Sequence, residues 1–559
     1  MQNCADVNEN QQNPYNYNEE VSRAKGQKAR SESIGGQPLP PFAPMPPQTG
    51  MSMRPRRRMT WRERLFIGTS GRPLTLQQER TLPNWLVGKS VVFFFIAFVA
   101  CTFVFGYPME MQYAIISSLS VLLFFYGSKS AINSAVHHGE KAFIKNVFVI
   151  GFVARLLWVL YVYFFFNPAH FDNTYGASSD VDWYMPFGEA IAGWIKGDKM
   201  HTFAQLTKSW NSDIGDVGYP VWLAVINLLT SGESDVFVPM VVKCIIGAYC
   251  AICIYHVAKR HFGEGTARIG ALFVALNPNM IFWCGTMMKE PEMVFLCCLC
   301  VDQMDKTFTS GRQLSFRGLL PGILVASSIF FFRAVLAIVL FLAMFAHIVM
   351  ASNRVMSMGK KVIAGVLVGV VLMVGMGDRI MTQAEKMVDA AQSDSQKTNM
   401  EWRSNFKDKG GRQQSFAKYA GAAVFAPLIF TIPFPTFNAA HEGQLTQMQL
   451  AGGSYIKNIL SFFVILVMLM MLISGEWRRH VFILAYTFGY LMVLVMSPFA
   501  QSGRFHMPIW PMLMLFAAYG VQIAKTNARV RKWFPIVLAI EVVACLAWNW
   551  FKLKGRGMI

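Results

Sequence analysis

Residues 85–105 read WLVGKSVVFFFIAFVACTFVF, an almost unbroken apolar run. A helix needs roughly 20 apolar residues to cross the hydrocarbon of a bilayer, and this run is long enough. Similar runs recur along the 559-residue chain, which is 54% hydrophobic and only 15% charged. Soluble proteins carry about 25% charged residues. The sequence therefore predicts an all-α polytopic membrane protein.

The apolar runs predict about thirteen transmembrane helices. Two further apolar segments do not fit a span. Residues 219–231 are too short, and the apolar part of 378–455 is interrupted by Pro427, Pro433 and Pro435. We expect both to be extracytoplasmic, interfacial or re-entrant segments. The predicted spans are 85–105, 112–126, 147–166, 236–257, 267–283 (kinked at Asn277-Pro278), 293–301, 319–332, 334–350, 362–376, 456–473, 482–496, 504–524 and 534–550.

Basic residues set the predicted orientation. Six arginines lie between residues 54 and 64, just before the first span, which favours a cytoplasmic N-terminus. Most other Lys and Arg also flank spans, so the formal net charge of +19 indicates membrane topology rather than nucleic-acid binding. The predicted parts are a disordered, basic cytoplasmic segment 1–83, a transmembrane hairpin 84–145, a transmembrane core 146–377, an extracytoplasmic region 378–455 and C-terminal helices 456–559.

An acidic outer loop, residues 167–218, interrupts the core and carries Asp180 and Asp182. After Asp182 apolar residues recur with helical spacing at Tyr184, Phe187 and Ile191. We expect an amphipathic helix that lies along the membrane surface, with Trp and Tyr on its apolar face. Pro186 would then be in its first turn, where proline is tolerated.

Four features face the predicted outer side: Asp180 with Asp182, Lys289-Glu290, Arg333, and Arg504-Phe505-His506. Each arginine taken singly is explained as well by a side chain that reaches the lipid head groups. Together, acids and cations at one face suit a reaction in which a base deprotonates a hydroxyl while cations hold a phosphate leaving group. The sequence has neither GxxxxGK[ST] nor a strand-linked GxGxxG, so an activated donor would be a lipid.

Residues 145–525 resemble the type C (GT-C) superfamily of integral-membrane glycosyltransferases, in the branch with protein O-mannosyltransferases and bacterial aminoarabinose transferases. The resemblance rests on the order of short motifs. They are Asp180-x-Asp182-x-Tyr184 followed by Glu189-Ala190, Gly218-Tyr219-Pro220, Lys259-Arg260-His261-Phe262-Gly263, Asn277-Pro278, and Arg504-Phe505-His506-Met507-Pro508 with Pro511.

The resemblance implies inverting transfer of a sugar from a polyprenyl-phosphate carrier to an extracytoplasmic glycan, lipid or protein. By that analogy Asp180 or Asp182 is the general base, and Asp180 is favoured. Lys289, Arg333 and Arg504 would hold the carrier phosphate, and His506 would assist them or simply be packed. Tyr184 and Glu290 would be supporting residues of the same site.

Some relatives bind a divalent metal at the loop carboxylates, here Asp180 and Asp182, and no other cofactor is implied. The chain departs from the mannosyltransferase pattern by its extra N-terminal hairpin and by having no recognisable lumenal domain. The sequence therefore does not predict the identity of the acceptor. The sequence favours a protein of the bacterial inner membrane.

Two other functions stay open. A polymerase or ligase of surface polysaccharide also carries outer-face arginines, but it does not need an early acidic loop. A transporter or flippase places its charges near the bilayer midplane and often has repeated halves. Here the charges cluster at the ends of spans and no internal repeat is visible.

Overall fold

The computed structural model describes residues 75–171, 181–197, 216–230, 236–310, 316–351, 431, 434–438, 449–496 and 503–555. Within these ranges the chain is helical and contains no strand, which confirms the predicted all-α fold. The predictions for residues 1–74, for a span at 362–376 and for most of 378–455 lie outside the described residues.

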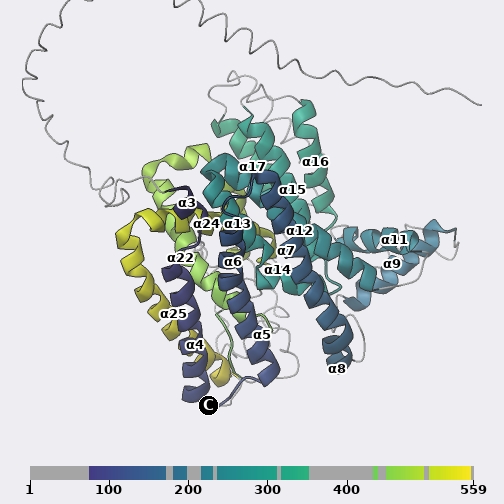
Figure 1. Cartoon of the computed structure of the whole chain (residues 1–559). Helices are drawn as coiled ribbons and strands as arrows, with labels where there is room; N and C mark the ends of the chain where they lie inside the picture. The colour runs from purple at the N-terminus through teal and green to yellow at the C-terminus, as the bar shows by residue number, and fades with distance from the viewer. Residues whose placement is uncertain are drawn as a thin grey trace, which may run out of the picture. The chain divides into compact units, whose positions relative to one another are not determined.

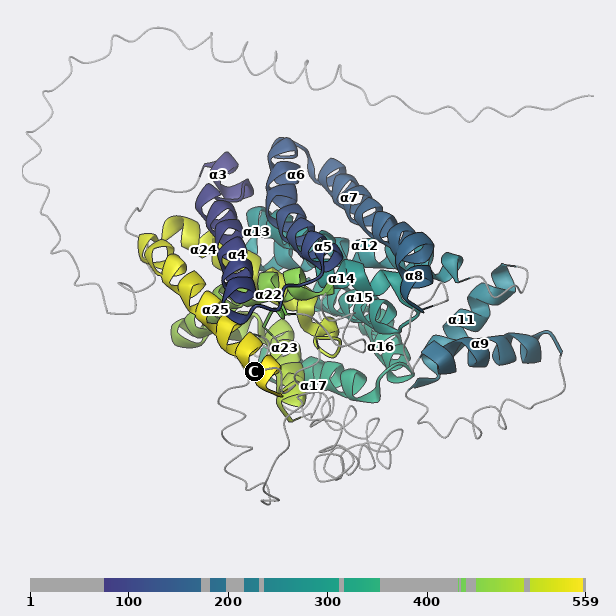
Figure 2. The same cartoon turned by 90° about the horizontal axis from the view of Figure 1, so that it is seen from below.

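Figure 1 shows the described helices in their arrangement. The N-terminal half contains α3 (Leu76–Arg80), α4 (Asn84–Phe105), α5 (Met111–Leu122), α6 (Ser128–Ser134), α7 (Glu140–Tyr161), α8 (Asn167–Phe171), α9 (Val181–Ile195) and α11 (Gly218–Leu229). The core continues with α12 (Phe237–Phe262), α13 (Glu264–Ala275), α14 (Pro278–Phe282), α15 (Glu290–Thr309), α16 (Phe316–Phe330) and α17 (Ala334–Ala351). The C-terminal helices are α22 (Ala451–Ser474), α23 (Val481–Met496), α24 (Trp510–Thr526) and α25 (Ala528–Gly555). The first and last long helices, α4 and α25, lie side by side in Figures 1 and 2.

Seven described helices are long and apolar enough to cross a membrane, or eight if the bent pair α13–α14 is one span. The protein is therefore an integral membrane protein. The expected number of about thirteen spans is not confirmed. Helices α11, α16, α17 and α23 are apolar but shorter, and α15 is too polar, because it carries acidic residues at both ends.

The break between α13 and α14 has a local cause. Pro278 starts α14, and the Asn277 side chain caps that helix by accepting from the N–H groups of Asn279 and Met280. The two helices are bent by 44°, as the Asn277-Pro278 pair predicted. A proline cannot supply an N–H to the last turn of α13. Arg155 of α7, fully buried, donates instead to the carbonyls of Val274 and Ala275.

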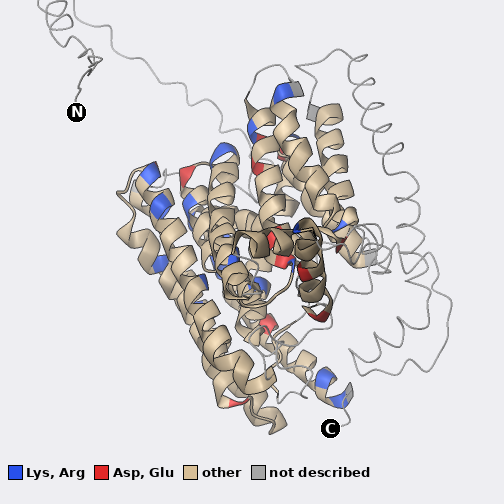
Figure 3. Ribbon diagram, turned by 90° about the vertical axis from the view of Figure 1, so that its right-hand side faces the viewer, with Lys and Arg blue, Asp and Glu red and all other residues tan. Residues whose placement is uncertain are grey.

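The long helices run between two ends, which we name by a residue at each. The Lys289 end carries Lys289, Glu290, Arg333 and Arg504, and both arginines form ion pairs with Glu290. The His261 end carries Arg260, His261, Asp305 and His480, also in contact. Most of the helical ribbon in Figure 3 belongs to uncharged residues, although single charges such as Arg155 of α7 and Lys457 of α22 lie within candidate spans. The predicted alternation of spans places these loops in the same two groups. Which of the two ends faces outward stays a prediction.

Helices α9 and α11 pack against each other side by side. The expected helix is present, but it begins at Val181, so Pro186 lies inside it rather than in its first turn. Its apolar residues Tyr184, Phe187 and Ile191 are buried, and the Tyr184 and Tyr219 rings meet edge to face at 5.0 Å. Helix α11 therefore covers this part of the face, whereas Trp194 and Ile195 of the same predicted face are 42% and 50% exposed, and contact with the membrane surface stays a prediction.

Gly218 fixes the position of α11. Its N–H donates to the carbonyl of Phe331 at 2.8 Å. A Cβ at this position would lie 2.7 Å from the ring of Phe332, which is closer than side chains approach one another. Only glycine therefore lets the start of α11 contact the turn that carries Arg333.

A hydrogen-bonded chain joins three elements at the His261 end. Asp305 of α15 accepts from Arg260 Nε and contacts His261 Nε2, both at 2.6 Å. His261 Nδ1 lies 2.7 Å from His480 Nδ1, so one of these two nitrogens carries a hydrogen and the other does not. A second proton on this pair would break the bond between the two rings.

Acid pH is expected to destabilise this end through His480. Burial lowers the pKa of His480 to about 4, whereas an unfolded chain keeps its histidines near 6.5. The unfolded state then binds the proton first. Stability is lost as the pH falls from about 6.5 to about 4, by at most roughly 1.4 kcal/mol per pH unit.

Thermal unfolding of the wild type and of His480→Asn across this pH range checks the expectation. Asparagine keeps a donor for His261 but does not titrate, so the variant should lose less stability in acid. His137→Asn, a change of an exposed histidine, serves as the control. Parallel pH curves for the wild type and His480→Asn would contradict the assignment.

Candidate functional site

The turn between α14 and α15 is held by a buried lysine. Lys243 of α12 is fully buried, and its Nζ donates to the carbonyls of Thr286 at 2.6 Å and Met288 at 2.8 Å. It also donates to the hydroxyl of Tyr219 at 2.8 Å and lies 3.9 Å from Glu292 Oε1. One side chain thus joins α11, α12 and the turn that delivers Lys289.

Lys289 is the last residue before α15 and is 4% exposed. Its ammonium forms an ion pair with Asp216 and lies 5.8 Å from the centre of the Tyr184 ring. Burial lowers the pKa of Lys289 below its ordinary value, and the Asp216 carboxylate partly opposes this effect. Lys289 therefore links α15 to the acidic loop through Asp216 and to α9 through Tyr184.

Two arginines lie next to the carboxylate of Glu290. Its carboxylate is fully buried, forms an ion pair with Arg504 and lies 3.9 Å from Arg333 Nη2. The ring of Phe505 lies 4.6 Å from the Arg333 guanidinium carbon, within cation–π range. Tyr490 of α23 holds the backbone at Phe505 by donating to its carbonyl at 2.8 Å. The two guanidinium groups are mostly buried, each side chain being less than a fifth exposed.

The charges of this group do not balance. Among the described residues of this group, four cations (Lys243, Lys289, Arg333 and Arg504) face three carboxylates (Asp216, Glu290 and Glu292), so their formal charges sum to +1. Within the described part of the chain, buried Arg333 Nη1 has no hydrogen-bond partner, and neither has the carboxylate oxygen Oε2 of Glu290. A buried charged donor without a partner is costly, which favours a ligand that completes it.

The structure brings together most of the residues that the sequence singled out. Lys289, Glu290, Arg333 and Arg504 belong to the group just described, and Tyr184 contacts it through Lys289. His506 is fully buried directly after Phe505. Asp182 is exposed in the first turn of α9, and no hydrogen bond or ion pair connects it to the group within the described ranges.

Asp180 lies outside the described residues, so the Asp180–Asp182 pair stays a prediction, as does a divalent metal at these carboxylates. The described residues contain no group of three His, Cys, Asp or Glu side chains that could hold a metal.

Three residues of the group were missed as site residues. Lys243 lies in an apolar run, and a charge inside such a run was the signal that could have found it. Glu292 and Asp216 were counted as outer-face acids but not selected. Their importance follows from their partners Lys243 and Lys289, which lie 49 and 73 positions away along the chain.

Searches with family models and against curated proteins found no match. Among solved structures, the chain is similar to the crystal structure of an oligosaccharyltransferase from Archaeoglobus fulgidus, in complex with zinc and sulfate. The match has a TM-score of 0.38 and 12% sequence identity, and it covers 71% of this chain and 53% of that chain. The chain thus spans about half the length of that protein. At this level of similarity, roles for individual residues have to come from this chain's own contacts.

Replacing Lys243 by methionine is expected to destabilise the protein by about 3–5 kcal/mol, because it leaves Glu292 as an unpaired buried charge. The carbonyls of Thr286 and Met288 also lose their donor. The matched control is Lys259→Met, at the other end of α12. Lys259 is 37% exposed in an ion pair with Glu140, where the loss should stay below about 1 kcal/mol. Unfolding of both variants in detergent measures the difference, and equal losses would contradict the role given to Lys243.

Proposed function

We propose that this protein is a membrane glycosyltransferase that moves a sugar from a polyprenyl-phosphate donor to an acceptor bound at the Lys289 end. The observation that carries the proposal is the convergence of Arg333, Arg504 and Lys289 around the buried carboxylate of Glu290. A group with surplus positive charge and an unpartnered guanidinium nitrogen suits an anionic ligand.

A phosphate fits these donors for chemical reasons. Guanidinium groups present planar pairs of N–H donors that match two phosphate oxygens. Their burial lowers the local dielectric and strengthens the attraction. As the sugar leaves, negative charge builds up on the carrier phosphate, and donors fixed in advance stabilise that charge more in the transition state than in the substrate. Arg333 and Arg504 are assigned this role, with Lys289 beside them.

A lipid-linked donor suits the location of the group. The cations lie at the ends of helices α15, α16 and α24, in a bundle that contains seven described helices long and apolar enough to cross a membrane. A polyprenyl chain would remain in the bilayer while its phosphate reaches the cations. The sequence has no nucleotide-binding motif that would favour a soluble donor.

The general base is proposed to be Asp180, with Asp182 as the alternative. Helix α9 begins directly after Asp180 and contacts the cationic group through Tyr184 and Lys289. A carboxylate there would take the proton from the acceptor hydroxyl as it attacks the sugar carbon, on the side opposite to the leaving phosphate. Such a displacement inverts the configuration at that carbon.

The Lys289 end is proposed to face away from the cytoplasm, in a bacterial inner membrane. This rests on the distribution of basic residues, because Arg478, Arg479, Lys525 and Arg529 lie at loops on the other end of the bundle. The acceptor would then be an extracytoplasmic glycan, lipid or protein.

Transfer of radiolabel from a panel of polyprenyl-phosphate sugars, in membranes that contain the intact protein, tests the proposal. The expected result is consumption of one donor, with label recovered in an acceptor and free polyprenyl phosphate as the co-product. Membranes without the protein are the control. If no donor of the panel is consumed, the glycosyltransferase assignment is wrong and a transporter becomes the better account.

A further inference from the structure

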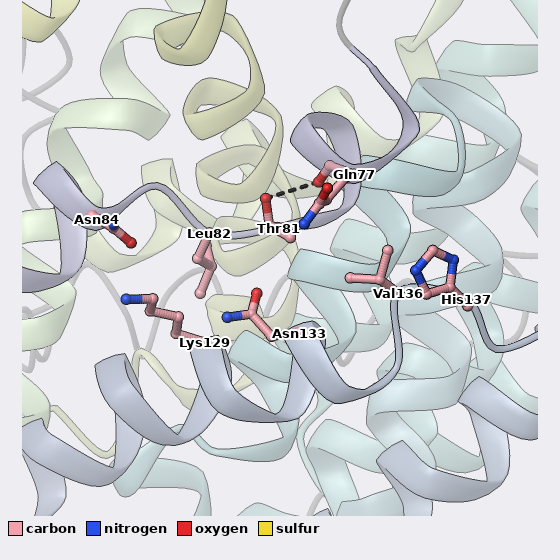
Figure 4. Close-up of a pocket in the computed structure, with 8 residues that line it drawn as sticks. All are labelled: Gln77, Thr81, Leu82, Asn84, Lys129, Asn133, Val136 and His137. Atoms are coloured by element: carbon pink, nitrogen blue, oxygen red, sulfur yellow. Dashed lines mark hydrogen bonds between the residues drawn. The ribbon is translucent and has the colours of Figure 1, made fainter.

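A cavity of about 350 Å³ opens at the His261 end, between α3, the start of α4 and α6. Figure 4 shows Lys129 and Asn133 extending from α6 toward Leu82 and Asn84 of the facing segment. The volume of the cavity falls within the range of small-molecule sites, roughly 300–1,000 Å³. The cavity lies at the end of the bundle opposite to the proposed active site. Ala135, which directly follows α6, accepts a hydrogen bond there from Arg268 in the first half of α13, and α13 begins shortly after His261.

The walls of the cavity are rich in hydrogen-bond donors. Lys129 contributes an ammonium group, Asn84 and Asn133 contribute amides, and His137 contributes an imidazole. The floor is apolar, formed by Leu82 and Val136, which are 3% and 4% exposed.

None of the described residues that line this cavity carries a carboxylate. The neighbouring acid, Glu79, points to α13, where its Oε1 accepts from the N–H of Gly265. Arg80 adds a cation next to the floor, because its Nη1 donates to the carbonyl of Val136 at 2.7 Å. Donors and positive charge without an acid among the described lining residues favour an anion, and phosphate is one anion that accepts hydrogen bonds from amides and an ammonium group.

The helices that form the cavity also carry exposed apolar side chains. Leu123 and Tyr126 lie within two turns of Lys129 and are 41% and 47% exposed. On α4, Val92 is 56% exposed and lies about two turns from Asn84. A phosphate in the cavity would therefore have apolar surface beside it that suits acyl chains.

We propose that this cavity binds a phosphate group, carried by a glycerophospholipid whose acyl chains lie along the exposed faces of α4 and α5. Lys129 holds the charge of the phosphate, and Asn84 and Asn133 donate to its oxygens. The same chemistry would accept a soluble phosphate compound, so the test separates the two sources. The site is independent of the glycosyl transfer proposed at the Lys289 end.

Native mass spectrometry of the full-length protein in detergent, titrated with phosphatidic acid, tests the proposal. Diacylglycerol with the same acyl chains is the matched lipid without phosphate, and glycerol 3-phosphate is the matched phosphate without chains. We expect one phosphatidic acid per protein and no binding of diacylglycerol. Lys129→Gln combined with Asn133→Ala should weaken binding about tenfold or more, because a charge-assisted hydrogen bond is lost.

Lys141→Gln is the control for the variant, since Lys141 is an exposed lysine of α7 at the same end that does not line the cavity. It should change the affinity less than about twofold. Lys129→Arg should retain binding, which separates loss of the site from loss of folding. Equal binding of phosphatidic acid and diacylglycerol, or an effect of the double variant no larger than that of Lys141→Gln, would overturn the proposal. Equal binding of glycerol 3-phosphate and phosphatidic acid would overturn the lipid assignment and assign the site to a soluble phosphate compound.

Discussion

Asp180→Asn or Asp182→Asn is expected to lower sugar transfer by ~10²–10⁴-fold, the usual contribution of a general base. Asparagine has nearly the same shape as aspartate but does not accept a proton at neutral pH. The acceptor hydroxyl would then have to attack without losing its proton, so the loss should appear in kcat rather than in the KM for the donor. We expect the larger loss for Asp180.

Transfer rates of the two variants in membranes, at matched expression, give the measurement. Glu189→Gln is the matched control, because Glu189 is an exposed carboxylate on the same helix and has no proposed role. Wild-type rates for both aspartate variants would rule out a base in this loop. A polysaccharide polymerase that relies on the arginines alone would then be the better account.

Arg333→Gln is expected to reduce transfer by ~10²–10³-fold, about the loss that follows removal of one donor to a developing negative charge. Arg333 suits this test better than Arg504. Its guanidinium lies 3.9 Å from Glu290, beyond hydrogen-bond distance, whereas Arg504 bonds that carboxylate directly. Its removal leaves Glu290 paired with Arg504, so the loss of transfer reports on the ligand rather than on an unpaired buried carboxylate.

The measurement is the rate of transfer as a function of donor concentration. Both the KM for the donor and kcat should worsen, because the phosphate carries charge before and during the reaction. Arg333→Lys should fall between Arg333→Gln and the wild type, since lysine keeps the charge but lacks the planar pair of donors. Arg317→Gln, near the other end of α16, is the matched control. If Arg333→Gln and Arg317→Gln behave alike, Arg333 does not bind the donor phosphate.

Helix positions were predictable because they depend on local properties. The run at 85–105 is realised as α4, and the run at 236–257 as α12, each because its length and apolar content suit a membrane helix. The break at Asn277-Pro278 was predictable for a similar reason, since a proline removes a helical hydrogen bond wherever it occurs. The number of spans is not confirmed, because several of the apolar runs form helices in the described residues that are shorter than a bilayer-crossing helix.

The partner of an apolar face was decided only by the tertiary structure. The spacing of Tyr184, Phe187 and Ile191 predicted the buried side of α9, but protein and lipid are both apolar neighbours and hydropathy does not distinguish them. The structure covers this side with α11, through the contact of Tyr184 with Tyr219.

The sequence by itself determined which charged loops share one end of the bundle, because spans alternate in direction and Lys289, Arg333 and Arg504 fall on the same side of that alternation. The pairing of these charges was decided only by the tertiary structure. Glu290 meets Arg504 across 214 positions, and Lys243 reaches Glu292 from within an apolar run. Such contacts depend on how helices pack laterally, and neither hydropathy nor spacing along one helix carries that information.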